Sequence, residues 1–302
     1  MSKYFFSPFL FISVLFGQFK ITSVEELQIP STETWSNPIF SPNGKEIFFT
    51  TVDFNGIWQY SLSSKLLKVI TSDQRSGYNF VIANDGQTIA YRRTTVEGDQ
   101  HTRIQEVVEL DLHTLSAKVF DKGNSISTPV YTKSGVTTTE RITHQKGISS
   151  TVNVQTQVLG IEDTKIVLLD NGTKRVFDPL KGGRYIWPKL SPDGSKIVAV
   201  DMERGAFISD LQGNNIVMLG KCNAPCWVRS GNWIIGMDDR DDGHMLTGSD
   251  IIAVSADGKR RIQLTSTVST VEMFPDVSPS ENKIVVSTAS GGLLLLMYEE
   301  VQ

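Results

Sequence analysis

A short motif recurs six times along this 302-residue chain and constrains the fold more than any other feature. A proline is followed by a small or apolar residue, a glycine and an isoleucine, each three positions further on, with substitutions in the weaker copies. The six copies begin at Pro38, Phe80, Pro129, Pro188, Pro225 and Pro275. Successive copies lie roughly 40 to 60 residues apart, and such periods indicate one supersecondary unit repeated around an axis or along a solenoid.

The residues inside the motif predict which unit is repeated. Ser-Pro-Asn-Gly at 41–44 and Ser-Pro-Asp-Gly at 191–194 are turn sequences, because proline presets φ and glycine accepts a positive φ. A short apolar, β-prone run follows each turn, as at 47–49 and 197–200. These runs do not alternate apolar with polar residues, which is typical of strands covered on both faces. The repeats therefore predict an all-β fold, a six-bladed β-propeller of four-stranded antiparallel blades.

Each predicted blade divides into strands A to D, with the proline segment in strand A and the isoleucine run in strand B. After the predicted strand C of blade six, which ends at Met297, only five residues remain, too few for an outer strand. We expect Val24 to Ile29 to supply that strand and close the ring, because an open sheet edge is a liability. Blade three departs most: Thr138 replaces the isoleucine, and 144–163 is predicted as an insertion between strands B and C.

The N-terminus predicts export. Lys3 precedes an apolar stretch at 4–16, which is too short to span a membrane but has the length of the core of a secretory signal. We expect residues 1–17 to be a signal peptide and 24–302 to be the propeller; a retained anchor or a disordered tail is the alternative. The expected product is a periplasmic or secreted monomer with no stable membrane span after signal removal.

Net charge and cysteine content further limit the kinds of protein that this chain can be. A net charge of −4 gives no electrostatic attraction toward nucleic acid, and 39% hydrophobic residues suffice for a core. The two cysteines, Cys222 and Cys226, could form a disulfide across the turn at Pro225 in an oxidising compartment. The alternative is two reduced thiols that pack in the interior, because so short a span often fails the geometry of a disulfide.

The motif resembles the TolB-type WD40-like propeller repeat, whose hallmark is Ser-Pro-Asp-Gly-Lys-x-Ile. Segments 41–47 and 191–197 carry it most clearly, 278–284 is a weaker copy, and Leu264-Thr265 matches the closing Leu-Thr of the repeat. The resemblance covers roughly residues 30 to 298 and implies a six-bladed propeller. TolB proteins are periplasmic, bind a partner lipoprotein at one propeller mouth and carry an additional N-terminal α/β domain, for which we expect no room here. The repeat serves binding proteins and enzymes alike.

Enzymes with similar propellers provide the alternative. The prolyl oligopeptidase group adds a hydrolase domain with a Gly-x-Ser-x-Gly elbow, which this sequence lacks. Oligogalacturonate lyases use a histidine-rich metal site, whereas this chain has four histidines in separate segments. Lactonase-like propellers hold calcium with a few acidic and amide side chains, so an enzyme with a divalent cation in the channel stays open.

Residues 238–244 form the densest group of ionisable side chains, in the predicted B–C loop of blade five. In a propeller the B–C and D–A connections share one face, so we expect this loop on the same rim as Arg92, Arg93, Arg184, Arg204 and the blade-three insertion. Carboxylates at this density could hold Ca²⁺, with Asp239, Asp241 and Asp242 as candidate ligands, while His244 could add a ligand or a proton switch. A solvated acidic loop, partly neutralised by Arg240, is the alternative.

Trp35, Trp187 and Trp227 lie at or near the start of strand A in three blades. There an indole could line the channel mouth and stack on a sugar or peptide, but we expect wedges between blades, because large aromatic side chains are usually in the core.

Together these features predict an exported, non-catalytic propeller that binds a protein, peptide or glycan on its B–C/D–A face, with no catalytic residues and no obligatory cofactor. The predicted recognition surface consists of Arg92, Arg204, Asp239, Asp241, Asp242 and His244. A lyase or lactonase-like hydrolase with a divalent cation is the alternative function. The acids are concentrated in one loop and do not come from several blades, which favours the binding protein.

Overall fold

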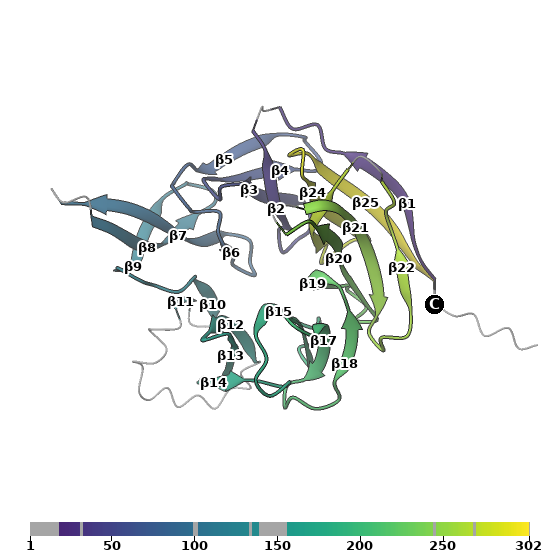
Figure 1. The fold of residues 1–302 in the computed structure, drawn as a ribbon. Helices are drawn as coiled ribbons and strands as arrows, with labels where there is room; N and C mark the ends of the chain where they lie inside the picture. The colour runs from purple at the N-terminus through teal and green to yellow at the C-terminus, as the bar shows by residue number, and fades with distance from the viewer. Residues whose placement is uncertain are drawn as a thin grey trace, which may run out of the picture.

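The computed structural model describes residues 18–30, 33–98, 102–132, 135–138, 156–243, 246–267 and 270–301. Within these ranges the regular structure consists of β-strands alone, and no helix has the length and apolarity needed to cross a membrane. The antiparallel sheets stand in a ring, with β15 and β19 near its centre and β5, β18 and β22 at its periphery (Figure 1). The predicted six-bladed β-propeller is therefore confirmed.

Strands A to D follow one another from the inside of each blade to the outside. Blades one and two consist of β2 (Trp35–Phe40), β3 (Glu46–Thr51), β4 (Ile57–Ser61) and β5 (Leu67–Thr71), then β6 (Val81–Ile82), β7 (Thr88–Glu97), β8 (Thr102–Asp111) and β9 (Ala117–Gly123). Blades four and five consist of β15 (Tyr185–Leu190), β16 (Lys196–Asp201), β17 (Gly205–Asp210) and β18 (Val217–Gly220), then β19 (Asn223–Trp227), β20 (Trp233–Asp241), β21 (Leu246–Ser255) and β22 (Arg261–Gln263).

Blade three differs from the four-stranded prediction. It contains a two-stranded sheet of β10 (Val130–Thr132) and β11 (Gly135–Thr137) and a three-stranded sheet of β12 (Gln157–Glu162), β13 (Lys165–Asp170) and β14 (Thr173–Phe177). The predicted strands C and D correspond to β13 and β14. Part of the predicted insertion is a strand: residues 157–162 form β12 and pair with β13 along its length. The earlier part of that insertion lies outside the described residues.

Blade six takes its outer strand from the N-terminus. The sheet contains β23 (Glu272–Val277), β24 (Lys283–Thr288) and β25 (Leu293–Val301), and β1 (Gln18–Glu26) pairs antiparallel with β25. The strand therefore begins before the predicted start at Val24 and ends before Ile29. The reason is that β25 itself continues to Val301, so its partner reaches back to Gln18.

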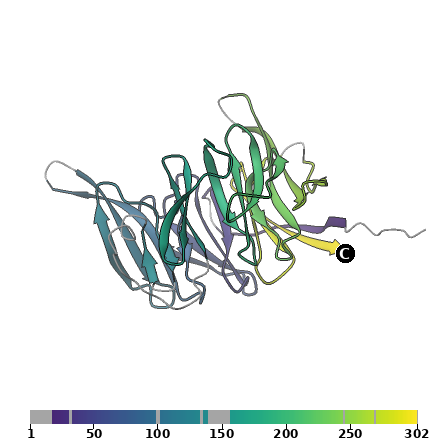
Figure 2. The same cartoon turned by 90° about the horizontal axis from the view of Figure 1, so that it is seen from below.

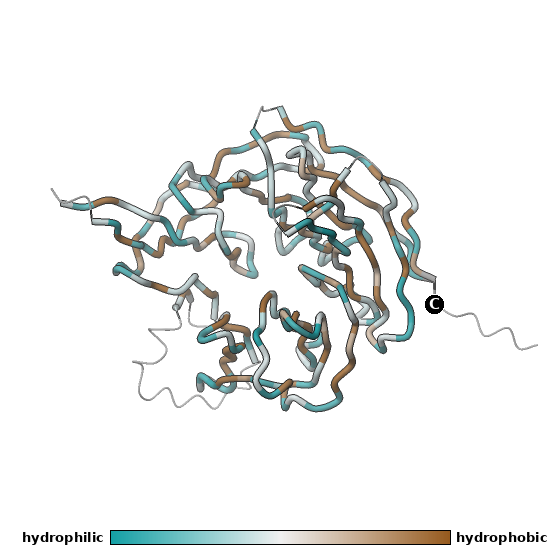
Figure 3. The backbone as a smooth tube through the Cα atoms, viewed as in Figure 1, coloured by the Kyte–Doolittle hydropathy of each residue, from teal (hydrophilic) through white to brown (hydrophobic). Residues whose placement is uncertain are grey.

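Hydrophobic clusters fill the space between neighbouring blades all the way round the ring. Trp35 and Phe49 of blade one pack with Leu295 of blade six, and Phe19 of β1 packs with Trp233 of blade five. Equivalent clusters join blades one to two, two to three, three to four and four to five. Hydrophobic segments accordingly run along the strands, while hydrophilic ones gather at many of the turns (Figure 3).

Two of the B–C hairpins that the structure describes are longer than the rest. Strands β7 and β8 of blade two span ten residues each, and β20 and β21 of blade five span nine and ten. The β7–β8 hairpin projects from the ring (Figures 1 and 2). Because B–C connections share one face of a propeller, the fold places the ends of both hairpins on that face, where the recognition surface is predicted.

Candidate functional site

The acidic run of blade five is part of a strand and not a loop, contrary to the prediction. Residues 238–241 belong to β20, and Asp239 pairs with Ser249 and Asp241 with Leu246 on β21. Neighbouring side chains along a strand point to opposite faces of the sheet. The run therefore divides its carboxylates between the two sides of blade five.

Most of these carboxylates have partners within the blade. Asp238 Oδ2 lies 2.8 Å from Arg261 Nη2, and Asn223 Nδ2 donates to Asp239 Oδ1 at 2.7 Å. Asp241 accepts from the backbone N–H of Gly243 at 2.9 Å. In the described part of the chain, no three His, Cys, Asp or Glu side chains are arranged to hold a metal ion.

Asp241 and Asp242 are exposed at the end of the β20–β21 hairpin. His244, the remaining predicted member of this group, lies outside the described residues. The end of the hairpin thus presents two carboxylates to solvent on the B–C/D–A face.

The two arginines of the predicted recognition surface, Arg92 and Arg204, form hydrogen bonds within their own surroundings. Arg92 Nη1 donates to the carbonyl oxygen of Ile126 at 2.6 Å, and its guanidinium lies over the ring of Tyr78 at 5.8 Å. Arg204 Nη1 donates to the carbonyl oxygen of Leu180 at 3.0 Å. No ion pair among the described residues joins either arginine to the acidic run. Among the described residues, the predicted recognition surface is therefore not assembled into a single cluster.

The innermost strands carry a repeated backbone irregularity that the sequence did not reveal. In five blades the residue just before the proline position of the motif has φ between 46° and 52°; these residues are Asn37, Asn79, Trp187, Ala224 and Phe274. In four of these blades the pairing of strand A with strand B shifts at this point. A β-bulge of this kind bends a strand and redirects its side chains.

An ion pair joins two of these innermost strands across blade five. Lys189 Nζ of blade four lies 3.5 Å from Asp276 Oδ1 of blade six, and the backbone N–H of Phe40 in blade one donates to Asp276 Oδ2 at 2.9 Å. Burial raises the pKa of Asp276, with Lys189 opposing the shift. Burial acts to lower the pKa of Lys189, but the nearby Asp276 carboxylate outweighs it and the pKa is raised. One carboxylate thus connects three blades.

Sequence reasoning missed this pair, although the repeat contained a signal for it. Lys189 and Asp276 directly follow Pro188 and Pro275, so they occupy equivalent positions in two copies of the motif. Blade one has Ile39 at that position and blade five has Cys226. Opposite charges at a position that is otherwise uncharged would have marked the two residues as partners.

The three tryptophans of strand A have different surroundings. Trp35 and Trp227 are 3% and 8% exposed and pack in the clusters between blades, as the wedge interpretation predicted. For Trp187 that interpretation is wrong, because its side chain remains 36% exposed. Lys189, two residues along β15, has 44% of its side chain exposed. Solvent therefore reaches part of an indole and part of a lysine side chain on the innermost strand of blade four, while the lysine ammonium group stays paired with Asp276.

The two cysteines are free and buried. Cys222 packs in the cluster between blades four and five, whereas Cys226 packs in the cluster between blades five and six. Burial raises the pKa of each thiol to about 12, so both are protonated at neutral pH. They behave as small core side chains.

No family model and no curated protein matches this chain. Among solved structures it is similar to TolB from Acinetobacter baumannii, with 20% identity, a TM-score of 0.53 and coverage of 78% of this chain. The match spans 55% of the TolB chain, about half of its length. An oligogalacturonate lyase in complex with manganese is 14% identical with a TM-score of 0.50, covering 87% of this chain and 76% of the lyase.

An oligogalacturonate lyase from Vibrio parahaemolyticus is 12% identical with a TM-score of 0.48, covering 86% of this chain and 76% of that protein. The TolB match shows that this chain has a TolB-like propeller fold. At this level of identity the likeness is one of fold.

Proposed function

We propose that this chain is an exported, non-catalytic propeller that binds a protein, peptide or glycan on the face formed by its B–C and D–A connections. The observation that carries the proposal is the exposed indole of Trp187 on the innermost strand. Large aromatic side chains are normally buried, and an exposed one offers a flat stacking surface. Trp187 also has a positive φ, a strained conformation for a bulky residue.

Charged groups on blades four and five support the same proposal. Lys189 supplies a partly exposed cationic side chain further along β15, and Asp241 and Asp242 supply exposed carboxylates at the end of the β20–β21 hairpin. Mixed charges on one face favour specificity and association rate more than affinity. Binding should therefore weaken as salt rises, since exposed charges are screened beyond about 10 Å at 0.1 M salt.

The test is capture of a partner from an envelope extract by the purified protein, followed by affinity measurement with defined variants. Trp187→Ala and the double variant Asp241→Ala, Asp242→Ala should each weaken binding without lowering the melting temperature. Val119→Ala, at an exposed position of outer strand β9, serves as the control. Undiminished affinity in both variants would refute the assignment of this face. Mass spectrometry of the mature chain tests removal of residues 1–17, and sedimentation tests the expected monomer.

The alternative function is a lyase or lactonase-like enzyme with a divalent cation, with Asp239, Asp241 and Asp242 as its expected ligands. Elemental analysis of the purified protein separates it from the binding protein. Near-stoichiometric calcium that is lost in Asp239→Ala would favour the enzyme. Metal content well below stoichiometric would leave the binding function as the stronger proposal.

A further inference from the structure

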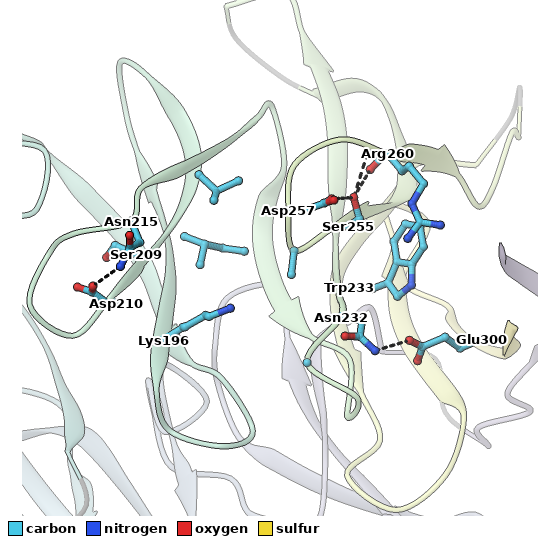
Figure 4. A pocket seen from close by; sticks show the side chains of 14 residues that line it. Lys196, Ser209, Asp210, Asn215, Asn232, Trp233, Ser255, Asp257, Arg260 and Glu300 are labelled. Carbon is cyan, nitrogen blue, oxygen red and sulfur yellow. Dashed lines mark hydrogen bonds between the residues drawn. The ribbon is translucent and has the colours of Figure 1, made fainter. Parts of the chain in front are cut away.

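A crevice of about 640 Å³ lies between blades four and five (Figure 4). Its lining comes from A–B and C–D turns and the strand ends beside them, so it opens on the face opposite the predicted rim. Ile208, Val217 and Ala256 provide an apolar floor. Next to the lining, Gly258 has φ +72° and lies close to Val217, since a Cβ there would be 2.8 Å from Val217 Cγ1.

Two carboxylates that line the crevice are already held by neighbouring polar side chains. Asp257 accepts from Ser255 Oγ at 2.6 Å, and Glu300 accepts from Asn232 Nδ2 at 3.2 Å. A carboxylate can accept about four hydrogen bonds, so both retain capacity for further donors. Their fixed positions reduce the entropy that a bound ligand must lose in ordering them.

Cationic donors complete the lining. The Lys196 side chain points into the crevice (Figure 4), and no carboxylate among the described residues forms an ion pair with it. The Arg260 guanidinium lies 4.7 Å from the centroid of the buried Trp233 ring, which holds it in place. Lys196 therefore lies across the crevice from Asp257 and Arg260 (Figure 4).

We propose that this crevice binds a neutral carbohydrate, a monosaccharide or disaccharide unit of a glycan. An anionic ligand would meet Asp257 and Glu300, and a cationic one would meet Lys196 and Arg260. A sugar hydroxyl both donates and accepts, so it matches both kinds of group, and the C–H face of the ring matches the apolar floor. The volume lies in the range of small-molecule sites. This site is independent of the proposed function on the opposite face.

The experiment is a titration of the ¹⁵N-labelled full-length mature protein followed by NMR, with maltose, cellobiose and lactose as probes. At least one of these should cause saturable shifts at residues 208–217, 231–233 and 255–260, with a dissociation constant of about 1 mM. Glucuronate and glucosamine serve as charged comparators for glucose and should bind more weakly than glucose does. Absence of saturable shifts with every neutral sugar, or tighter binding of either charged sugar, would overturn the proposal.

Lys196→Met removes the ammonium group and keeps most of the stem. It should weaken sugar binding about fivefold, the equivalent of one lost hydrogen bond, at an unchanged melting temperature. Lys118→Met is the matched control, because Lys118 is exposed on outer strand β9 of blade two and does not line the crevice. Equal loss in both variants would contradict the assignment. The double variant Asp241→Ala, Asp242→Ala should leave the sugar shifts unchanged, so this test and the test of the rim succeed or fail separately.

Discussion

Phe19 provides the sharpest test of how the N-terminal strand stabilises the propeller. It lies near the start of β1, is 2% exposed and stacks on Tyr298 of β25 with ring centroids 4.7 Å apart. Its ring is also 5.6 Å from that of Trp233 in blade five. One side chain from the beginning of the domain therefore joins the last blade to the fifth.

Replacing Phe19 by alanine should lower the free energy of unfolding by about 3–5 kcal/mol, the range for removing a buried phenylalanine from a core. A domain is typically stable by only about 5–15 kcal/mol, so the loss is a large fraction of the total. Urea unfolding followed by tryptophan fluorescence measures it. Because Phe19 packs between two blades, the variant should still unfold in one cooperative transition. The midpoint of that transition should shift to a lower urea concentration.

Val24→Ala on the same strand is the matched control, because Val24 is 53% exposed. It should change stability by no more than about 0.5 kcal/mol. If Phe19→Ala costs less than about 1 kcal/mol, β1 does not belong to the cooperative unit and the reasoning fails.

Two further predictions concern single positions. Gly44→Ala should be more destabilising than Gly86→Ala, although both glycines have φ near 70°, because a Cβ at Gly44 would lie 2.1 Å from Ser280 Oγ whereas Gly86 faces open space. The backbone strain that both variants share costs about 1 kcal/mol. Equal losses of stability in urea unfolding would contradict the role of the Ser280 contact. Burial raises the pKa of Glu272, against the Thr267 hydrogen bond, and its Oε2 has no hydrogen-bond partner among the described residues. A carboxyl group whose pKa is raised in the folded state contributes stability at pH values below its unfolded pKa. This contribution is lost as the pH rises through the folded pKa. Melting temperatures from about pH 4 to pH 7 should therefore fall less steeply in Glu272→Gln than in the natural protein, and identical slopes would refute the assignment.

The repeat predicted the blades because its turn chemistry is local. Gly44 and Gly194 have φ of 72° and 71°, the positive values that the turn sequences required. The apolar runs after them are completely buried, since each strand B lies between two neighbouring blades. Local sequence therefore determined where strands B start.

The ends of the strands depend on the neighbouring strands with which they pair, so they were harder to predict from the sequence. Charged residues are depleted in strands, so the run at 238–241 indicated a loop. In the structure the hairpin extends beyond the neighbouring blades, where water reaches charged side chains while β21 satisfies the backbone of β20. Likewise, residues 298–301 were too few for a new strand but sufficient to lengthen β25, and this moved the start of β1.

The bulge in strand A suggests that Trp187 is retained at a cost in stability. Asn37 and Asn79 occupy the equivalent position in blades one and two with φ of 50° and 52°, and asparagine tolerates this conformation better than bulky residues do. Trp187 has the same φ and remains 36% exposed, so it gains less burial than Trp35 or Trp227 in exchange for the strain. Trp187→Asn should therefore raise the free energy of unfolding by about 0.5–1 kcal/mol while weakening partner binding, as expected where a strained site serves function. Trp187→Phe keeps a bulky residue at the bulge and should bring no such gain. A loss of more than about 1 kcal/mol in Trp187→Asn would instead show that the indole supports the fold, and the binding role assigned to it would fall.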